Sequence, residues 1–391
     1  MRGAPRDSIF RRLRPNEPPD TWHQVTITMK GITMKLVNTL APRGAGAGRR
    51  IAAFAALATT VALVATGCAA ATPGDDAGSD GEGTTEALSI AFLPKQLNNP
   101  YTDVVLSGGE AGTEEIGGEY SVVGPLEASA SSQVSFINTL TQQGTKVIVI
   151  AANDPDAVGP ALEEARAGGA KIVAFDSDTN PDYRDVFISQ VVSKDVALIQ
   201  VEQIAEQIGG SGEIAILSAT ANATNQNEWI KFIEEELASN PEYADITLVA
   251  KVYGDDDDAK SFQEAQGLLS AYPNLKGIIS PTTVGIAATA RYLSTTDYKG
   301  KVALVGLGLP NEMREFVKDG TVKEFALWDP AQLGYVAAFA GQALVDGTIT
   351  GAVGDTFMAG ELGEKEVGEG GIVIVGPPTR FNADNIDDYD F

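Results

Sequence analysis

Short apolar runs alternate with amphipathic stretches along most of this chain, and this alternation limits its fold more than any other feature. The first stretches between the runs end in glycine, which favours the left-handed conformation that closes a helix. The runs are almost continuously hydrophobic, which is typical of parallel strands that helices cover on both faces. The first series predicts strands at 88–94, 120–125, 146–152 and 171–178.

The same alternation then restarts and predicts a second series of strands at 213–220, 246–254, 277–283, 301–308 and 323–329. Two such series predict an α/β protein with two doubly wound, Rossmann-like parallel-sheet domains in tandem. The length agrees with this, because single hydrophobic cores rarely grow beyond roughly 250–300 residues.

The domain boundaries follow from where each series begins and ends. A multi-strand hinge is expected between the domains, with 186–195 as the first crossover. The apolar helix at 331–347 should pack back onto the first domain, and the tail should add one more strand. The expected domains are 88–190 plus 329–352 for the first, and 191–328 plus 353–391 for the second.

The N-terminal part has the pattern of an export signal. The apolar run at 51–65 follows several basic residues and is shorter than the roughly 20 residues that a membrane span needs. We therefore interpret 34–67 as a signal peptide. Residues 1–33 precede its basic region, and we interpret them as an extension from a mis-assigned start codon.

The only cysteine, Cys68, stands where this apolar run gives way to a Gly-, Asp- and Ser-rich stretch. The sequence Ala-Thr-Gly-Cys that ends there resembles a bacterial lipobox, although alanine replaces the usual leucine. This resemblance implies cleavage before Cys68 and lipid attachment to its thiol, with 68–87 as a flexible tether. The alternatives are a buried cysteine and a free thiol after a membrane anchor.

Composition excludes several functions for the exported part. Residues 1–68 hold 10 of the 28 basic and 3 of the 53 acidic side chains, which leaves 18 basic and 50 acidic, a net charge of −32. This charge argues against nucleic acid as a partner. The only histidine, His23, precedes the cleavage point, so His-based triads and His-ligated metals are excluded. Carboxylate-based chemistry remains possible on composition alone, and we expect no metal or cofactor.

Ligands of open parallel sheets bind outside the carboxyl ends of the strands. Two such domains facing each other would close on a ligand by a hinge motion. The predicted strands end in Pro94-Lys95, Asp154, Asp176-Ser177-Asp178, Thr220-Ala221-Asn222, Pro281-Thr282-Thr283, Gly308 and Trp328-Asp329.

Several motifs in one order carry a resemblance to a known family: FLPKQLNNPY (92–101), FDSD (175–178), ATNQNEW (223–229), SPTTVGIAA (280–288) and FALWDP (325–330). From about residue 88 to its C-terminus the chain resembles the type I periplasmic sugar-binding proteins of bacterial ABC importers. Within them it is most similar to the branch that binds rhamnose and autoinducer-2. This resemblance implies the type I periplasmic binding protein fold, no enzymatic activity and an ABC permease as partner.

The resemblance also implies which residues bind the ligand. Asp176 would hydrogen-bond sugar hydroxyls, Lys95 would hydrogen-bond the ligand, and the Trp328 indole could stack on a sugar face. The implied set is Lys95, Asn99, Tyr101, Asp176, Asp178, Asn225, Gln226, Pro281, Thr283, Trp328 and Asp329.

Three positions depart from the patterns of relatives. Asn225 replaces an aspartate and Thr283 an alanine of the autoinducer-2 binders, which favours rhamnose. Gly308 stands where ribose-type binders place a second carboxylate.

We therefore expect a monomeric protein that captures a neutral monosaccharide, with L-rhamnose as the first choice, and delivers it to the permease. Autoinducer-2, or another pentose or hexose, is the alternative ligand. The lipid on Cys68 would anchor the protein to the outer face of the cell membrane, where a sensor protein remains a second possible partner.

Competing functions have weaker support in the sequence. A glycosidase needs two facing acids, and Asp176 with Asp329 is the only obvious pair. A sugar-responsive repressor needs an N-terminal helix-turn-helix where this chain has a signal and a tether. The acidic run at 255–258 lacks the spacing of a calcium loop, and acids at a helix N-terminus explain it more simply.

Overall fold

The computed structural model describes residues 87–391. The extension at 1–33, the signal peptide at 34–67, Cys68 and nearly all of the tether at 68–87 lie outside the described residues. Residues 81–391 belong to one compact unit. Within the described part, no helix has both the length and the apolar character that crossing a bilayer requires.

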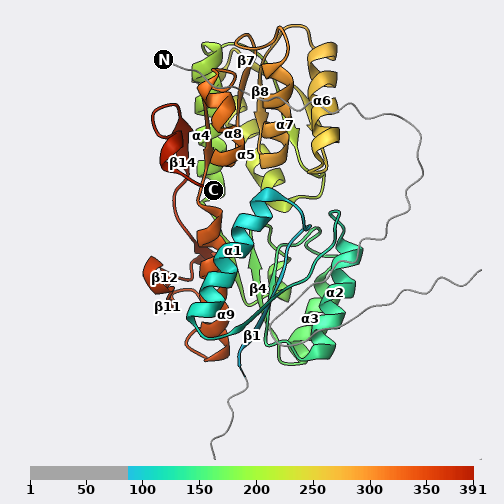
Figure 1. The fold of residues 1–391 in the computed structure, drawn as a ribbon, viewed down its shortest axis with the longest axis vertical. Helices are drawn as coiled ribbons and strands as arrows, with labels where there is room; N and C mark the ends of the chain where they lie inside the picture. Colours follow the sequence, from blue (N-terminus) through green and yellow to red (C-terminus); the bar gives the residue numbers. More distant parts are fainter. Residues whose placement is uncertain (1–86) are drawn as a thin grey trace, which may run out of the picture. The chain divides into compact units, whose positions relative to one another are not determined.

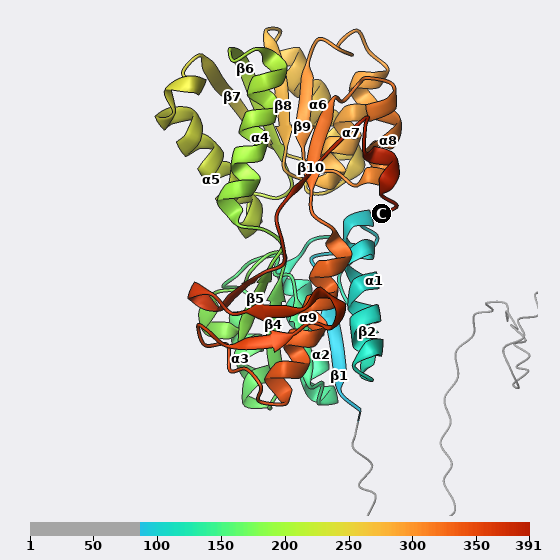
Figure 2. The same cartoon turned by 90° about the vertical axis from the view of Figure 1, so that its left-hand side faces the viewer.

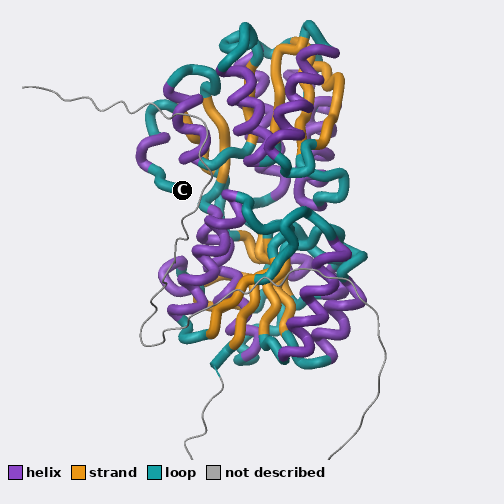
Figure 3. The backbone as a smooth tube through the Cα atoms, turned by 45° about the vertical axis from the view of Figure 1, so that its right-hand side comes forward, coloured by secondary structure: helices purple, strands orange, loops and turns teal. Residues whose placement is uncertain are grey.

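The first domain is built on a sheet in which every strand is parallel to its neighbours. The strand order is β13-β5-β4-β3-β1-β2, and helices lie on both faces (Figures 1 and 3). Its elements are β1 (Ser89–Leu93), α1 (Pro100–Glu115), β2 (Glu119–Val122), α2 (Ala130–Gln143), β3 (Val147–Ile150), α3 (Gly159–Ala167), β4 (Lys171–Phe175), β5 (Val186–Ser189), α9 (Pro330–Val345), β11 (Thr356–Met358), β12 (Glu364–Glu366) and β13 (Ile372–Ile374).

The second domain repeats this plan with a parallel sheet of order β7-β6-β8-β9. A bridge between Leu307 and Ala326 extends it toward the antiparallel pair β10 and β14 (Figure 2). Its elements are α4 (Ser193–Ile208), β6 (Gly212–Ser218), α5 (Thr224–Ser239), β7 (Ile246–Tyr253), α6 (Asp258–Ala271), β8 (Leu275–Ser280), α7 (Thr283–Ser294), β9 (Ala303–Gly306), α8 (Pro310–Lys318), β10 (Glu324–Leu327) and β14 (Thr379–Asn382).

The central strands form because β-branched residues suit a sheet that is buried on both faces. All four residues of β3 are fully buried. The helices between the strands have defined ends: the Ser129 side chain caps the start of α2, and Gly144 closes it at a φ of 72°. These features confirm the predicted α/β class with parallel sheets.

Helices α1 and α9 lie side by side against the first sheet (Figure 1). Glycines allow their backbones to approach closely: a Cβ on Gly108 would lie 1.8 Å from the backbone oxygen of Ala331, and one on Gly334 would lie 2.0 Å from that of Val105. The predicted packing of 331–347 onto the first domain is confirmed. This packing fixes the start of α1, which carries ligand-binding candidates.

Two expectations about the chain path need correction. The stretch 186–195 is not a crossover throughout, because its first residues form β5 of the first sheet and its end begins α4. The tail 353–391 does not belong wholly to the second domain: β13 pairs with β5, and only β14 pairs with the second domain's β10. The sequence pattern missed these strands because each is only three or four residues long.

Candidate functional site

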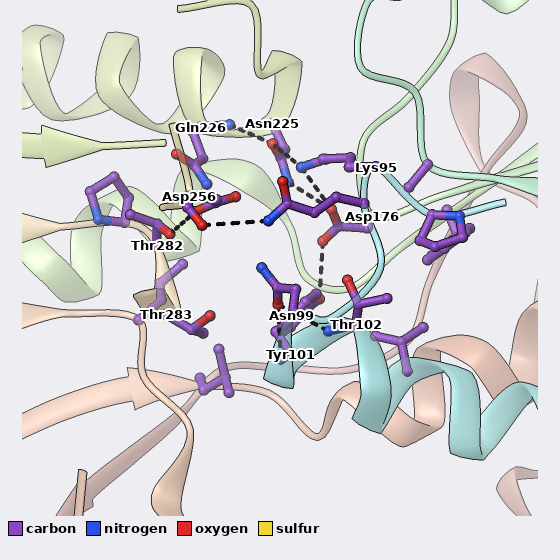
Figure 4. Close-up of a pocket in the computed structure, with 18 of the residues that line it drawn as sticks. Lys95, Asn99, Tyr101, Thr102, Asp176, Asn225, Gln226, Asp256, Thr282 and Thr283 are labelled. Carbon is purple, nitrogen blue, oxygen red and sulfur yellow. Dashed lines mark hydrogen bonds and ion pairs between the residues drawn. The ribbon is translucent and has the colours of Figure 1, made fainter. Parts of the chain in front are cut away.

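A cavity of about 60 Å³ lies between the two domains, at the carboxyl ends of their strands (Figure 4). The polar part of its lining comes from the loop after β1, the starts of α1 and α5, the ends of β4 and β8, and the turn between β7 and α6. The predicted residues that line it are Lys95, Asn99, Tyr101, Asp176, Asn225, Gln226, Pro281, Thr283 and Trp328.

Asp176 is the centre of the polar network. Its Oδ2 lies 3.0 Å from the Lys95 Nζ and accepts a hydrogen bond of 3.3 Å from the Asn225 amide, while its Oδ1 accepts one of 3.0 Å from the Tyr101 hydroxyl. The residue is 7% exposed and has a φ of 57°, which is uncommon for a residue other than glycine. Strained backbone of this kind concentrates at functional sites.

The start of α1 positions two of the candidates through its own capping. The Asn99 side-chain oxygen accepts the backbone N–H groups of Tyr101 and Thr102, at 3.0 and 3.2 Å, and Pro100 occupies the first turn. Because capping uses the oxygen of Asn99, only its NH₂ group remains for a ligand. The Asn-Asn-Pro-Tyr sequence therefore both begins the helix and places Tyr101 beside Asp176.

The Tyr101 hydroxyl links Asp176 to an aromatic wall. It accepts a hydrogen bond of 3.0 Å from the Trp328 indole N–H and donates to Asp176. Burial, and next the charge of Asp176, raises the pKa of Tyr101 well above its ordinary value, so the hydroxyl stays protonated. The Trp328 ring packs edge-on against Tyr101 and Trp229, with centroids 6.2 and 5.9 Å away. These rings supply apolar surface beside the polar network.

The second domain contributes amide groups from the first turn of α5. The Gln226 side-chain oxygen accepts hydrogen bonds from the Ser218 hydroxyl at 2.6 Å and from a backbone N–H at the end of β6 at 2.8 Å. This fixes the side chain, so its NH₂ group is the part available to a ligand. The Asn225 oxygen accepts from its neighbour's backbone at 2.9 Å and from Lys95 at 3.4 Å.

Polar contacts join the two domains directly around this cavity. Lys95 and Asp176 of the first domain contact Asn225 of the second, and the Ser177 and Thr224 hydroxyls lie 2.8 Å apart. A small polar molecule held here would touch both domains, so its binding would favour the arrangement in which they meet.

A sequence model of the periplasmic binding protein domain matches residues 90–349. The chain belongs to this family. The D-apiose import binding protein of Actinobacillus succinogenes is 27% identical over 258 residues, which cover 64% of this chain and 80% of that protein. The relatives are binding proteins of transport systems, and this chain is likewise a binding protein and not an enzyme.

Solved structures show the same relationship. A sugar ABC transporter structure from Actinomyces odontolyticus is 70% identical, covers 78% of this chain and 97% of its own, and has a TM-score of 0.65. A solute-binding protein from Clostridium phytofermentas with bound L-rhamnose is 36% identical over 78% and 98%, with a TM-score of 0.75. LsrB from Clostridium saccharobutylicum in complex with AI-2 is 25% identical over 77% and 99%, with a TM-score of 0.74.

Two of the ligand-binding candidates in this binding protein do not line the cavity. The Asp178 carboxylate is held by Arg184 through bonds of 2.6 and 2.8 Å, and burial raises its pKa although Arg184 opposes the shift. Asp329 caps α9 by accepting the backbone N–H of Ala331 at 2.9 Å. Both carboxylates are committed to structural bonds, so we remove them from the candidate set.

Sequence reasoning missed several lining residues: Gln96, Trp229, Asp256 and Thr282. Gln96 follows Lys95 directly, and Trp229 belongs to the core of the second domain but also faces the cavity. For the acidic run that contains Asp256, the sequence predicts only a helix start. That interpretation fits its neighbour Asp257, whose side chain caps α6 by accepting the backbone N–H of Lys260 at 2.7 Å.

Proposed function

We propose that this protein is the extracytoplasmic solute-binding component of a sugar ABC importer. We further propose that its ligand is a neutral monosaccharide, with L-rhamnose as the first choice. The carrying observation is the cavity between the domains, in which a carboxylate, a lysine and amides lie beside indole and phenol rings. The 36% identical protein with bound L-rhamnose supports this choice of sugar.

The chemistry of the lining suits a neutral polyol. The Asp176 carboxylate accepts hydrogen bonds from hydroxyls, whereas the Lys95 ammonium and the NH₂ groups of Asn99 and Gln226 donate to them. A pyranose ring also has apolar C–H faces, which aromatic rings cover well. The methyl group of a 6-deoxysugar needs an apolar wall, and Phe175, Leu307 and Trp328 supply one in this cavity.

Domain closure would couple binding to delivery. The chain passes between the domains after β5, before α9 and after β13, and such short segments can act as hinges. A sugar that bonds to Asp176 on one side and to Gln226 on the other favours the closed form. A permease that recognises this form would then accept only the loaded protein.

Autoinducer-2 is the second candidate ligand, supported by the 25% identical LsrB structure in complex with AI-2. Autoinducer-2 and L-rhamnose would bind in the same cavity of this protein. Asn225 and Thr283 weigh against this ligand, because the resemblance to autoinducer-2 binders implies an aspartate and an alanine at these positions. A neutral amide in place of a carboxylate removes one charged acceptor from the site.

We further propose that the mature protein begins at Cys68 and is anchored by a lipid on that residue to the outer face of the cell membrane. The apolar run before Cys68 and the Gly- and Asp-rich stretch after it support this proposal. The protein would act as a monomer beside its permease. Mass spectrometry of the membrane fraction should find the acylated cysteine as the first residue; an unmodified thiol there would contradict the anchor.

Calorimetric titration of residues 69–391, which include the whole compact unit from Gly81, tests the ligand. We expect a heat signal with micromolar or tighter affinity for L-rhamnose and little signal for the autoinducer-2 precursor. The reverse result would move the protein to the signal-binding branch. Heat from neither compound, nor from D-ribose and D-apiose, would contradict the sugar assignment.

A further inference from the structure

A second carboxylate, that of Asp256, faces the same cavity from the second domain (Figure 4). It lies in the turn between β7 and α6, where Asp255 and Asp256 have φ values of 56° and 50°. Two successive residues other than glycine in the left-handed region are unusual and cost free energy. In this turn Asp255 pairs with Lys260, whereas Asp256 lines the cavity.

The surroundings of Asp256 hold it firmly but leave part of it unused. The Thr282 hydroxyl donates a hydrogen bond to its Oδ1, and the Gln96 side chain of the first domain donates one of 3.4 Å to its backbone oxygen. Among residues 87–391, no group hydrogen-bonds its Oδ2 and no basic side chain forms an ion pair with it. An acceptor therefore remains in the lining of the cavity.

The other acids of the run have roles outside the cavity. Asp257 caps α6, and Asp258 forms two hydrogen bonds of 2.8 Å with Arg291. Within the described residues neither Asp256 nor Asp257 forms an ion pair, but Asp257 caps a helix, and only Asp256 of this run lines the cavity.

The Asp256 side chain is partly buried, and withdrawing an acid from water without a charged partner is costly unless hydrogen bonds compensate. Burial raises the pKa of Asp256, the nearby charge of Asp176 raises it further, and the Thr282 bond and Lys95 oppose the shift. A sugar hydroxyl that donates to the free oxygen would supply the missing hydrogen bond.

We propose that Asp256 is a second ligand-binding carboxylate that accepts a hydrogen bond from one sugar hydroxyl and so selects among sugars that differ at that carbon. The proposal rests on the proposed function, because it takes the ligand to be a sugar. Asp176 from the first domain and Asp256 from the second would then bind different hydroxyls of one ring. Asp256 also supplies the second carboxylate that is missing at Gly308, from a different element of the fold.

Titration of L-rhamnose and its 2-, 3- and 4-monodeoxy analogues into wild-type protein and three variants tests this. Because a hydrogen bond to a charged group contributes about 1.5–3 kcal/mol, Asp256→Ala should weaken L-rhamnose binding about 10- to 100-fold. Asp256→Asn keeps the size and a partner for Thr282, and should weaken binding less. Asp255→Asn removes the same charge one residue away, outside the cavity, and should leave affinity unchanged.

The deoxy analogues separate direct contact from an indirect effect. One analogue, which lacks the hydroxyl that Asp256 binds, should bind wild-type protein weakly and lose no further affinity in Asp256→Ala. Asp256 does not select the sugar if each analogue, compared with L-rhamnose, loses the same factor of affinity in wild-type protein and in Asp256→Ala. The proposal also fails if Asp256→Asn and Asp256→Ala bind L-rhamnose as tightly as Asp255→Asn does. If the wild-type protein binds no sugar at all, the proposed function fails first. Thermal unfolding without ligand verifies that each variant is folded.

Discussion

Replacing Asp176 with asparagine should weaken binding of the sugar at least about a hundredfold. The carboxylate organises Lys95, Tyr101 and Asn225, and it is the acceptor that we assign to sugar hydroxyls. Each charge-assisted hydrogen bond is worth about 1.5–3 kcal/mol, and two of them to the ligand account for this factor. Titration calorimetry with L-rhamnose measures the change directly.

Asp178→Asn is the matched control, because it makes the same substitution two residues away. Its carboxylate bonds to Arg184, whose side chain is only 3% exposed, and does not line the cavity. We expect unchanged affinity but a lower free energy of unfolding, since the variant leaves a buried guanidinium without its charged partner. Equal losses of affinity in the two variants would show that the whole loop matters rather than the Asp176 carboxylate.

Much of the fold was predictable because it depends on local patterns. Continuous apolar runs such as 147–150 indicate buried parallel strands, and glycine after an amphipathic stretch indicates the end of a helix. The strand β13 was not predictable in this way. Three residues carry too little pattern, and their place beside β5 depends on contacts almost 200 residues apart in the chain.

The candidate site was predictable at strand ends but not at the level of individual carboxylates. Asp176 and Asp178 look equivalent in the sequence, and only the position of Arg184, after the turn that follows them, commits Asp178 to a structural bond. Asp256 belongs to a run of four aspartates that look alike in the sequence but differ in their backbone angles in the structure. A left-handed φ is a property of the folded turn, and the residue types alone do not predict it.

Replacing Gly108 with alanine should lower the free energy of unfolding by about 3 kcal/mol, at the upper end for overpacked sites. The new methyl group would lie 1.8 Å from the backbone oxygen of Ala331, so α1 and α9 must move apart. A flexible side chain could relieve such a clash by changing its rotamer, whereas the backbone atoms of a helix cannot. The movement would also displace Tyr101 at the start of α1 and Trp328 just before α9, so weaker sugar binding should accompany the loss of stability.

Helix propensity alone predicts the opposite sign, because alanine is favoured over glycine inside a helix by about 1 kcal/mol. Gly267 in α6 provides the control, since a Cβ there meets no atom within 4 Å. Gly267→Ala should therefore raise the free energy of unfolding by about 0.5–1 kcal/mol. Denaturant unfolding of the two variants separates packing from propensity: if Gly108→Ala is also stabilising, the close approach of α1 and α9 does not determine the stability of the first domain.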